Sequence, residues 1–346
     1  MKHQTTRYGE IPFYKIGTFG NTADAFISKK LFLEYKTKYS FPKKGDILIS
    51  ASGTIGRAVI YDGKPAYFQD SNIVWIDNDE TLVKNDFLFY AYSNVKWNTE
   101  HTTILRLYND NFRNTLIPLP PLNEQIAIAN ILSALDRYLY ALDALILKKE
   151  GVKKSLSFEL LSQRKRLKGF NQAWQRVRLG DIANYLTSNL SAEQITQQGK
   201  IKVYDVNNFI GYTDTTFISD KPYISIVKDG SVGRVRILPP KTNILSTMGA
   251  LIANHRTTTE FLFYLLSNFD FKNFTSGSII PHIYFKDYKE KTIFLPPLNE
   301  QSTIANILSA LDNEITSLKN KKRQFENIKK ALNHDLMSAK IRVLKK

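Results

Sequence analysis

The chain of 346 residues contains no cysteine, so it can form neither a disulfide nor a thiolate-ligated metal site. It also has no uncharged apolar run approaching the roughly 18 residues of a membrane-spanning helix. Its first residues, MKHQTTRYGEIPF, hold no apolar stretch of the signal-peptide kind. Acidic residues are few beside basic ones, 32 against 48, which leaves a formal net charge of +16. We therefore expect a soluble, cytoplasmic protein with no membrane partner, whose natural partner is a polyanion such as nucleic acid.

Motifs for the common reactions on nucleotides are missing as well. A G-x-x-x-x-G-K-[ST] phosphate loop is absent, which excludes ATP-driven translocation by this chain. An adenine methyltransferase would carry Asn or Asp before Pro-Pro and an aromatic residue after it, but leucine flanks both Pro120-Pro121 and Pro296-Pro297. The five histidines lack metal-ligand spacing, and no carboxylate pair recurs in both halves. The sequence thus predicts a chain without a catalytic centre, metal or cofactor of its own.

What the chain does contain is a long internal repeat. Residues 119–136, LPPLNEQIAIANILSALD, return at 295–312 as LPPLNEQSTIANILSALD, with 16 of 18 positions identical at an offset of 176. A period of this length marks two domain-sized modules and not a stacked array of short repeats. Upstream, residues 1–118 and 172–294 share only scattered landmarks. Two different heads are thus joined to two similar segments, 119–168 and 295–346, which we call the necks.

Each neck is predicted to be one long helix that begins at its Pro-Pro pair, where proline and a following acidic residue suit a first turn. Apolar residues then recur at intervals of three and four, as in a coiled-coil seam. The seam residues are Leu122, Ile126, Ala129, Leu132, Leu135, Leu139, Leu142, Ile146, Val152, Leu156 and Leu160 in the first neck and Leu298, Ala305, Leu308, Leu311, Ile315, Leu318, Phe325, Ile328, Leu332 and Leu336 in the second.

The order of the segments sets the direction of the two helices. Because the second helix begins where the second head ends, the seams can pair only if the helices run antiparallel, with a head at each end. About 39 residues at about 1.5 Å per residue predict a rod roughly 58 Å long. The alternative is that each helix is buried separately in its own head.

The heads are predicted to be strand-rich. Alternating runs bounded by turn residues indicate strands at 46–50, 58–61 and 72–76, and at 223–227 and 234–238. The dense aromatic segments 87–93 and 261–267 favour short helices. The predicted fold class is therefore α+β, with two strand-rich mixed domains separated by a coiled-coil rod of two long antiparallel helices, related by a pseudo-two-fold axis.

Basic and polar residues near the expected turns are the candidate DNA contacts. Gly53 and Gly56, like Gly230 and Gly233, favour a tight turn between strands over a phosphate cradle. Arginine suits phosphates and guanine edges, and Asn or Gln can read adenine. The candidates are Arg57, Arg106, Tyr108, Asn109, Asn111 and Arg113 in the first head and Arg234, Ser276, Ser278, His282, Tyr284 and Lys286 in the second, with Arg57 matching Arg234, Arg106 matching His282 and Tyr108 matching Tyr284.

Taken together, these features resemble the specificity subunits of type I restriction-modification systems. The resemblance covers nearly the whole chain and includes two target-recognition domains, the doubled Pro-Leu-Pro-Pro-Leu-Asn-Glu-Gln type of motif, and the stretch SIIPHI at 278–283. It implies a non-catalytic subunit that binds a bipartite, asymmetric site on double-stranded DNA. It also implies partner subunits that carry the cofactors: two copies of an adenine methyltransferase with S-adenosylmethionine, and restriction subunits, which are translocases, with ATP and Mg²⁺.

Two other classes of function remain open on the residues alone. One is an autonomous bipartite DNA-binding protein without enzymatic partners, and the other is an enzyme with an unrecognised active site. Copurification separates them, because only a specificity subunit brings down a methyltransferase in a two-to-one ratio.

The neck openings match in their polar residues as closely as in their apolar ones. Asn123, Glu124 and Gln125 return as Asn299, Glu300 and Gln301. A seam that only had to pair could drift, so we expect these six residues to form two equivalent docking sites for the methyltransferase. Shared helix capping, or a recent gene duplication or conversion, would also produce matching polar residues.

The first head departs from the second at its beginning. Nothing before Tyr8 matches the segment 174–182, and aligning 9–11 with 199–201 leaves the first head short of roughly 20 residues of its first strand region. Either the head closes without them, or the tail at 341–344 supplies part of the edge, or the chain is a shortened or recombined allele.

Overall fold

The computed structural model describes residues 4–68, 72–97 and 106–344. The chain divides into two compact units, the first made of Met1–Asp143 and Asn320–Lys346 and the second of Ala144–Lys319. Each unit therefore combines one head with one half of each neck. This division differs from the four segments expected from the repeat, because it cuts both necks in the middle.

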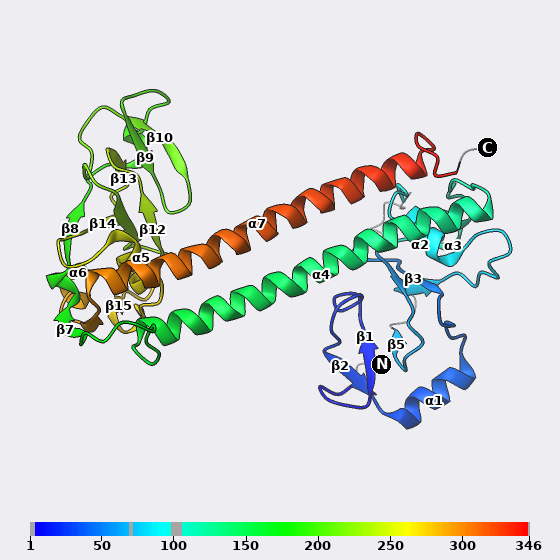
Figure 1. The fold of residues 1–346 in the computed structure, drawn as a ribbon. Coiled ribbons are helices and arrows are strands. Elements are labelled where there is room, and N and C mark those ends of the chain that lie inside the picture. Colours follow the sequence, from blue (N-terminus) through cyan, green and yellow to red (C-terminus); the bar gives the residue numbers. More distant parts are fainter. Residues whose placement is uncertain (1–3, 69–71, 98–105, 345–346) are drawn as a thin grey trace. The chain divides into compact units, whose positions relative to one another are not determined.

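Each neck is a single helix of 40 residues: α4 spans Leu122–Leu161 and α7 spans Leu298–Met337 (Figure 1). Both begin directly after the Pro-Pro pair, as predicted. Within each unit the two helix halves pair antiparallel, since the residue number rises along α4 as it falls along α7. The ion pairs that show this are Asp136–Lys329 and Asp143–Lys322 in the first unit and Glu150–Lys319 and Lys153–Asp312 in the second. The alternative of two separately buried helices is wrong.

The apolar seam is less continuous than the sequence pattern predicted. Leu132 and Leu142 are buried, but Leu122 is 38% exposed, Ile126 47% and Val152 45%. At the opening of α4 the buried face carries Ile128 instead, because the short helix of the head packs against that side. Beyond the openings, ion pairs such as Asp143–Lys322 and Glu150–Lys319 join the two helices beside buried apolar residues such as Leu142 and Ile315.

The first head contains two three-stranded sheets. One has the order β2-β1-β5, with β1 antiparallel to β2 and parallel to β5, and the other is the antiparallel sheet β4-β3-β6. The elements are β1 (Ile11–Tyr14), β2 (Ala25–Ile27), α1 (Lys29–Lys38), β3 (Ile47–Ser50), β4 (Ala58–Ile60), β5 (Tyr67–Phe68), β6 (Ile73–Trp75), α2 (Asn85–Tyr92) and α3 (Asn109–Arg113).

The second head repeats this plan and extends it. Its sheet β10-β9-β13 has the pairing directions of β2-β1-β5, and β12-β11-β14 matches β4-β3-β6 with β8 added at one edge. The elements are β7 (Gln175–Arg178), β8 (Ala183–Thr187), β9 (Ile201–Tyr204), β10 (Phe209–Thr213), β11 (Tyr223–Val227), β12 (Val235–Leu238), β13 (Thr242–Ile244), β14 (Met248–Ala253), α5 (Thr259–Ser267), β15 (Thr275–Ser276), β16 (His282–Ile283), α6 (Phe285–Tyr288) and β17 (Thr292–Leu295), with short 3-10 turns at Leu179–Asp181, Ala192–Gln194 and Lys272–Phe274.

These elements confirm the strands and the two short helices expected in the heads. They also show what the first head lacks, because β7 and β8 have no counterpart among its described residues. In the second unit β7 pairs with β17, which leads into α7. The tail at 341–344 contains no strand, so it does not supply the missing edge.

The core of each unit lies where the head meets the necks. In the first unit Phe87 and Ala91 of α2 pack on Ile128 and Leu132 of α4 and on Leu336 of α7. In the second unit α5 packs in the same way on the start of α7 and the end of α4. Each head is therefore held by the beginning of one neck and the end of the other.

Candidate nucleic-acid interface

A glycine turn connects two paired strands in each head. Gly53 and Gly56 follow β3 with φ of +68° and +79°, and Gly230 and Gly233 follow β11 with φ of +83° and +81°. These angles are left-handed and favour glycine. Bonds from the Gly56 amide to the Ser50 carbonyl and from the Gly233 amide to the Val227 carbonyl, both 2.9 Å, close the turns alike. The expected tight turn is confirmed.

An aromatic ring closes the space behind each turn. A Cβ built on Gly56 would lie 2.2 Å from Nε1 of Trp97, and one on Gly233 would lie 2.6 Å from Cδ2 of Phe271. Since real Cβ atoms do not approach this closely, neither glycine can gain a side chain without displacing a ring. The two rings stand at equivalent places in the sequence, because each ends the landmark segment that the heads share, FLFYAYSNVKW at 87–97 and FLFYLLSNFDF at 261–271.

A second segment reaches each turn and forms what we call the corner of the head. In head 1 the corner joins 51–57 to 106–108, through a bridge between Ser52 and Arg106 and a 2.8 Å bond from the Leu107 amide to the Ala51 carbonyl. The guanidinium carbon of Arg106 lies 5.9 Å from the ring centre of Tyr108, which is exposed. The structure thus brings together two of the predicted contact residues.

The corner of head 2 joins 228–234 to 282–284 in the same way. A bridge links Asp229 to His282, and the Ile283 amide donates to the Lys228 carbonyl at 2.9 Å. Nδ1 of His282 lies 2.6 Å from Oδ1 of Asp229. The His282 ring stacks on Tyr284 with centres 6.4 Å apart, and the predicted match of Arg106 to His282 and of Tyr108 to Tyr284 is confirmed in position.

The arginines that end the two turns are also equivalent. The carbonyls of Arg57 and Arg234 accept 2.9 Å bonds from Ser50 and Val227, and both side chains are exposed. The guanidinium of Arg57 donates to the Phe19 carbonyl at 3.0 Å, so part of its bonding capacity is used inside head 1.

The remaining candidates lie beside the corners. Asn111 accepts a 2.6 Å bond from the Tyr108 amide and so caps α3, while Asn109 and Arg113 are exposed on that helix. In head 2, Ser276 pairs with His282 across β15 and β16. Ser278 and Lys286 are exposed, and the Lys286 ammonium lies 5.4 Å from the Tyr284 ring centre.

Two corner residues were not predicted. Ser52 is buried and donates to Oδ1 of Asn72 at 2.8 Å, and Asp229 carries the carboxylate that His282 contacts. The sequence singles out basic and polar residues as DNA contacts, but Ser52 is not among those chosen and Asp229 is acidic. The signal that could have found them is their place directly before each glycine turn.

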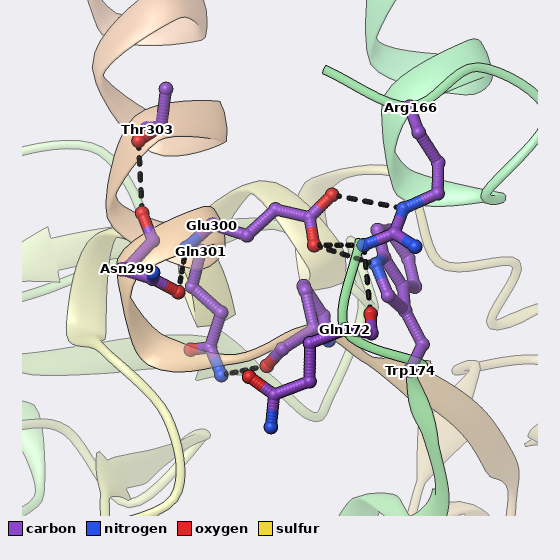
Figure 2. A network of polar contacts seen from close by, with 8 residues as sticks. Arg166, Gln172, Trp174, Asn299, Glu300, Gln301 and Thr303 are labelled. Carbon is purple, nitrogen blue, oxygen red and sulfur yellow. Dashed lines mark hydrogen bonds and ion pairs between the residues drawn. The ribbon is translucent and has the colours of Figure 1, made fainter. Parts of the chain in front are cut away.

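The neck openings are engaged inside their own units. Glu300 is fully buried, and its carboxylate accepts 2.7 Å and 3.3 Å bonds from Arg166 and a 2.9 Å bond from Nε1 of Trp174, as Figure 2 shows. Arg166 also donates to the Gln172 carbonyl at 2.8 Å. Because Arg166 follows the end of α4, this network ties the start of one neck to the end of the other.

Gln301 is also fully buried and is bonded on both sides of its amide. Its nitrogen donates to the carbonyls of Arg256 and Pro296 at 2.9 Å and 2.8 Å. Its oxygen accepts 3.0 Å bonds from the Thr257 hydroxyl and the Thr258 amide, next to the start of α5. A buried side-chain amide that makes four hydrogen bonds within the chain has a structural role.

The first unit repeats both arrangements, with Glu124 and Gln125 at the offset of 176 from Glu300 and Gln301. Arg342 donates to the buried Glu124 at 2.5 Å, as Arg166 does to Glu300, and holds the pKa of the Glu124 carboxyl below its ordinary value. Gln125 accepts from the Lys84 amide at 2.8 Å.

A tyrosine bound to an aspartate anchors the head helix in each unit. The Tyr90 hydroxyl donates to Asp136 at 2.7 Å, and the Tyr264 hydroxyl donates to Asp312 at 2.9 Å. Burial, and next the bond to the carboxylate, raise the pKa of both phenols. Each hydroxyl therefore stays protonated and keeps its donor role at neutral pH.

These contacts correct the interpretation of the neck openings. Glu124, Gln125, Glu300 and Gln301 are buried and bonded within the chain, so their side chains are not available to a partner in this structure. The premise that packing cannot account for matched polar residues is wrong, since both repeats must build the same internal network. Of the six predicted residues only Asn123 and Asn299 are exposed.

Comparison with known proteins identifies the family. The family model described as "Type I restriction modification DNA specificity domain" matches residues 1–149 and again 171–327. The chain therefore belongs to the type I restriction-modification DNA specificity family, and it carries two copies of the family's domain, as its repeat and its two equivalent heads require.

Proteins named as type I restriction enzyme specificity subunits are similar to this chain in sequence. A type I restriction enzyme specificity subunit of Haemophilus influenzae is 63% identical over 137 residues, which make up 39% of this chain and only 36% of that protein. The MjaX specificity subunit of Methanocaldococcus jannaschii is 28% identical over 335 residues, covering 86% of this chain and 79% of that protein. The MjaVIII subunit of the same organism is 25% identical over 362 residues, covering 92% and 84%.

Solved structures show the same fold. The S subunit of a type I restriction-modification system from M. genitalium superposes with a TM-score of 0.64 at 21% identity, over 97% of this chain and 91% of that one. A chain from a structure of the assembly and conformational transition of a type I system gives a TM-score of 0.52 at 15% identity, over 85% and 82%.

Two further features of the structure concern metal ions and membranes. Within residues 4–68, 72–97 and 106–344, His, Asp and Glu side chains nowhere gather in threes as a metal ion would require. Among the same residues, no helix is both long and apolar enough to cross a membrane.

Proposed function

We propose that this specificity subunit binds a bipartite, asymmetric site on double-stranded DNA, one half-site per head, as the non-catalytic member of its complex. The observation that supports this best is the pair of corners. The same scaffold presents Arg106 in one head and His282 with Asp229 in the other. Unlike side chains at equivalent places suit two different half-sites, whereas identical ones would suit a palindrome.

The net charge of +16 supports DNA as the ligand, since basic side chains neutralise phosphates and release counterions. The partners follow from the family. Two methyltransferase subunits with S-adenosylmethionine would modify adenine, and restriction subunits with ATP and Mg²⁺ would cleave. The chain would position both in the cytoplasm.

The exposed side of each neck opening offers a docking surface in place of the buried polar residues. Leu122 and Leu298 are 38% and 48% exposed at equivalent positions. Asn130 and Asn306 lie further along the same side of the two helices, also exposed and also identical. Within the part of the chain that the structure describes, no hydrogen bond or ion pair engages these four side chains, so internal bonding does not account for the match. We assign two equivalent docking surfaces for the methyltransferase to these sides.

Native mass spectrometry tests the docking surfaces. Leu122→Asp should reduce the complex from two methyltransferases to one, and adding Leu298→Asp should remove the second. Tyr140→Asp is the matched control, because Tyr140 is 79% exposed on α4 beyond the opening. Two methyltransferases still bound to the double variant would rule these surfaces out.

Sequencing of methylated adenines tests the DNA target, in cells that carry this gene with its partner subunits. We expect one motif made of two unlike half-sites with an unspecified spacer. A continuous or palindromic motif would contradict the proposal. Specific binding by the purified chain, with no methyltransferase bound on copurification, would instead favour the autonomous DNA-binding protein.

A further inference from the structure

The two corners differ in the hydrogen-bonding character of their paired side chains. Arg106 has donors only, and its bridge partner Ser52 turns its hydroxyl into head 1 to meet Asn72. In head 2 the partner is Asp229, a carboxylate with acceptors only, and its side chain is 29% exposed. The two bridged pairs are equivalent, but the strongly charged member is a cation, Arg106, in head 1 and an anion, Asp229 at the place of Ser52, in head 2.

The carboxylate of Asp229 is held in a fixed position. Its Oδ1 lies 2.6 Å from Nδ1 of His282, and the His282 ring stacks on Tyr284, whose ring has the Lys286 ammonium 5.4 Å away. This bond occupies one carboxylate oxygen, and a carboxylate has a second. A short bond to a ring that is itself stacked restricts rotation of the aspartate.

A fixed carboxylate on a DNA-binding surface has few favourable partners, because phosphates repel it. The donors that DNA presents in the major groove are the amino groups N6 of adenine and N4 of cytosine. Guanine presents two acceptors there, N7 and O6, which an arginine can meet with two donors. The chemistry of each corner thus matches a different class of base.

We propose that the bridged pair is where the two heads select different bases: Arg106 selects guanine in one half-site, and Asp229, positioned by His282, selects adenine or cytosine in the other. This assignment rests on the proposed DNA-binding function. It adds Asp229 as a residue that contacts the base and His282 as the residue that holds it in place.

Selection of bound duplexes from a randomised double-stranded DNA library by the full-length chain in complex with its methyltransferase subunits tests the assignment. Asp229→Ser should lower discrimination at one position of one half-site by about 5- to 150-fold and leave the other half-site unchanged. Arg106→Ala is the matched variant and should act at one position of the opposite half-site. His282→Ala should weaken the preference that Asp229 sets, and His282→Asn, which can still donate to the carboxylate, should restore part of it.

A gain of preference provides the sharpest test. Asp229→Ser combined with His282→Arg copies the corner of head 1 into head 2 and should shift the altered position towards guanine. An unchanged motif with Asp229→Ser overturns the inference and leaves the proposed function standing. Loss of the whole half-site with the isosteric Asp229→Asn also overturns it, since the residue would then support the head and read no base. If the wild-type chain selects no motif, the proposed function fails and the inference with it.

Discussion

Removal of the Glu300 carboxylate tests whether the neck openings serve the fold of this chain or a partner. Glu300 accepts bonds from Arg166 and Trp174 and is fully buried, whereas the Arg166 side chain is 27% exposed. Glu300→Ala leaves a guanidinium without its counter-ion and an indole NH without an acceptor. We therefore expect a less stable second unit, and not an intact protein that has lost a partner.

The size of the effect follows from burial. Breaking a buried ion pair by removing one partner costs about 3–5 kcal/mol, and the lower value applies here because water can still reach Arg166. A loss of about 3 kcal/mol lowers the melting temperature of a unit of this size by about 6–12 °C. The double variant Glu300→Ala, Arg166→Met should recover part of this loss, since it also removes the unpaired charge.

Calorimetry of the full chain measures the loss, and hydrogen exchange followed by mass spectrometry shows where it falls. Exchange should rise at the start of α7 and the end of α4. Ser302→Ala is the control, because Ser302 lies exposed one turn into α7. A Glu300→Ala variant that melts like wild type but binds one methyltransferase fewer would refute the reasoning and restore the docking interpretation.

Three further predictions concern single side chains. Glu124→Gln should make the stability of the protein depend less on pH in the acid range. Arg342 lowers the pKa of the Glu124 carboxyl below 4.5, so its contribution to the free energy of unfolding is complete above that pH and is lost as pH falls through the lowered pKa. Denaturant titration from pH 7 to pH 3 measures this. Arg57→Ala and Arg234→Ala should each weaken DNA binding by about 1–3 kcal/mol and reduce the base preference at one position of one half-site. An equal loss of affinity for all DNA sequences, with a shallower salt dependence in filter binding, would show that these arginines contact phosphates. Gly233→Ala should reduce thermal stability by about 1–3 kcal/mol, because its φ of +81° and the ring behind it oppose a Cβ, and an unchanged melting temperature would contradict the strain.

The long helices and the main strands could be predicted from sequence because their signals are local. The Pro-Pro pairs mark both helix starts to the residue, and alternation marks β3, β4 and β11 to within a residue or two. The seam could not be followed as reliably. The period of the apolar residues predicts which side of a helix can be buried. At each neck opening the side that is buried depends on where α2 or α5 packs, and residues distant in the sequence set that position.

The role of Glu300 was missed because a charged residue near a helix start is usually exposed and favoured by the helix dipole. Its partner lies 134 residues away, so no local pattern connects them. A signal was nevertheless present in the repeat. Arg166 and Arg342 stand at the offset of 176, beyond the stretch of high identity, and so do Lys153 and Lys329. Charges that recur at the repeat offset where the surrounding sequence has drifted predict ion pairs with the retained acidic residues.

Each unit contains the beginning of one neck helix and the end of the other, and this division sets an order for folding during synthesis. The second unit is built from one continuous stretch, Ala144–Lys319, and its Arg166–Glu300 pair closes as soon as residue 300 is available. The first unit must wait for Arg342, which lies 218 residues after Glu124. The head that is made first is therefore completed last, and the face of α2 that packs on Leu336 of α7 stays open to solvent until the end of α7 has been made.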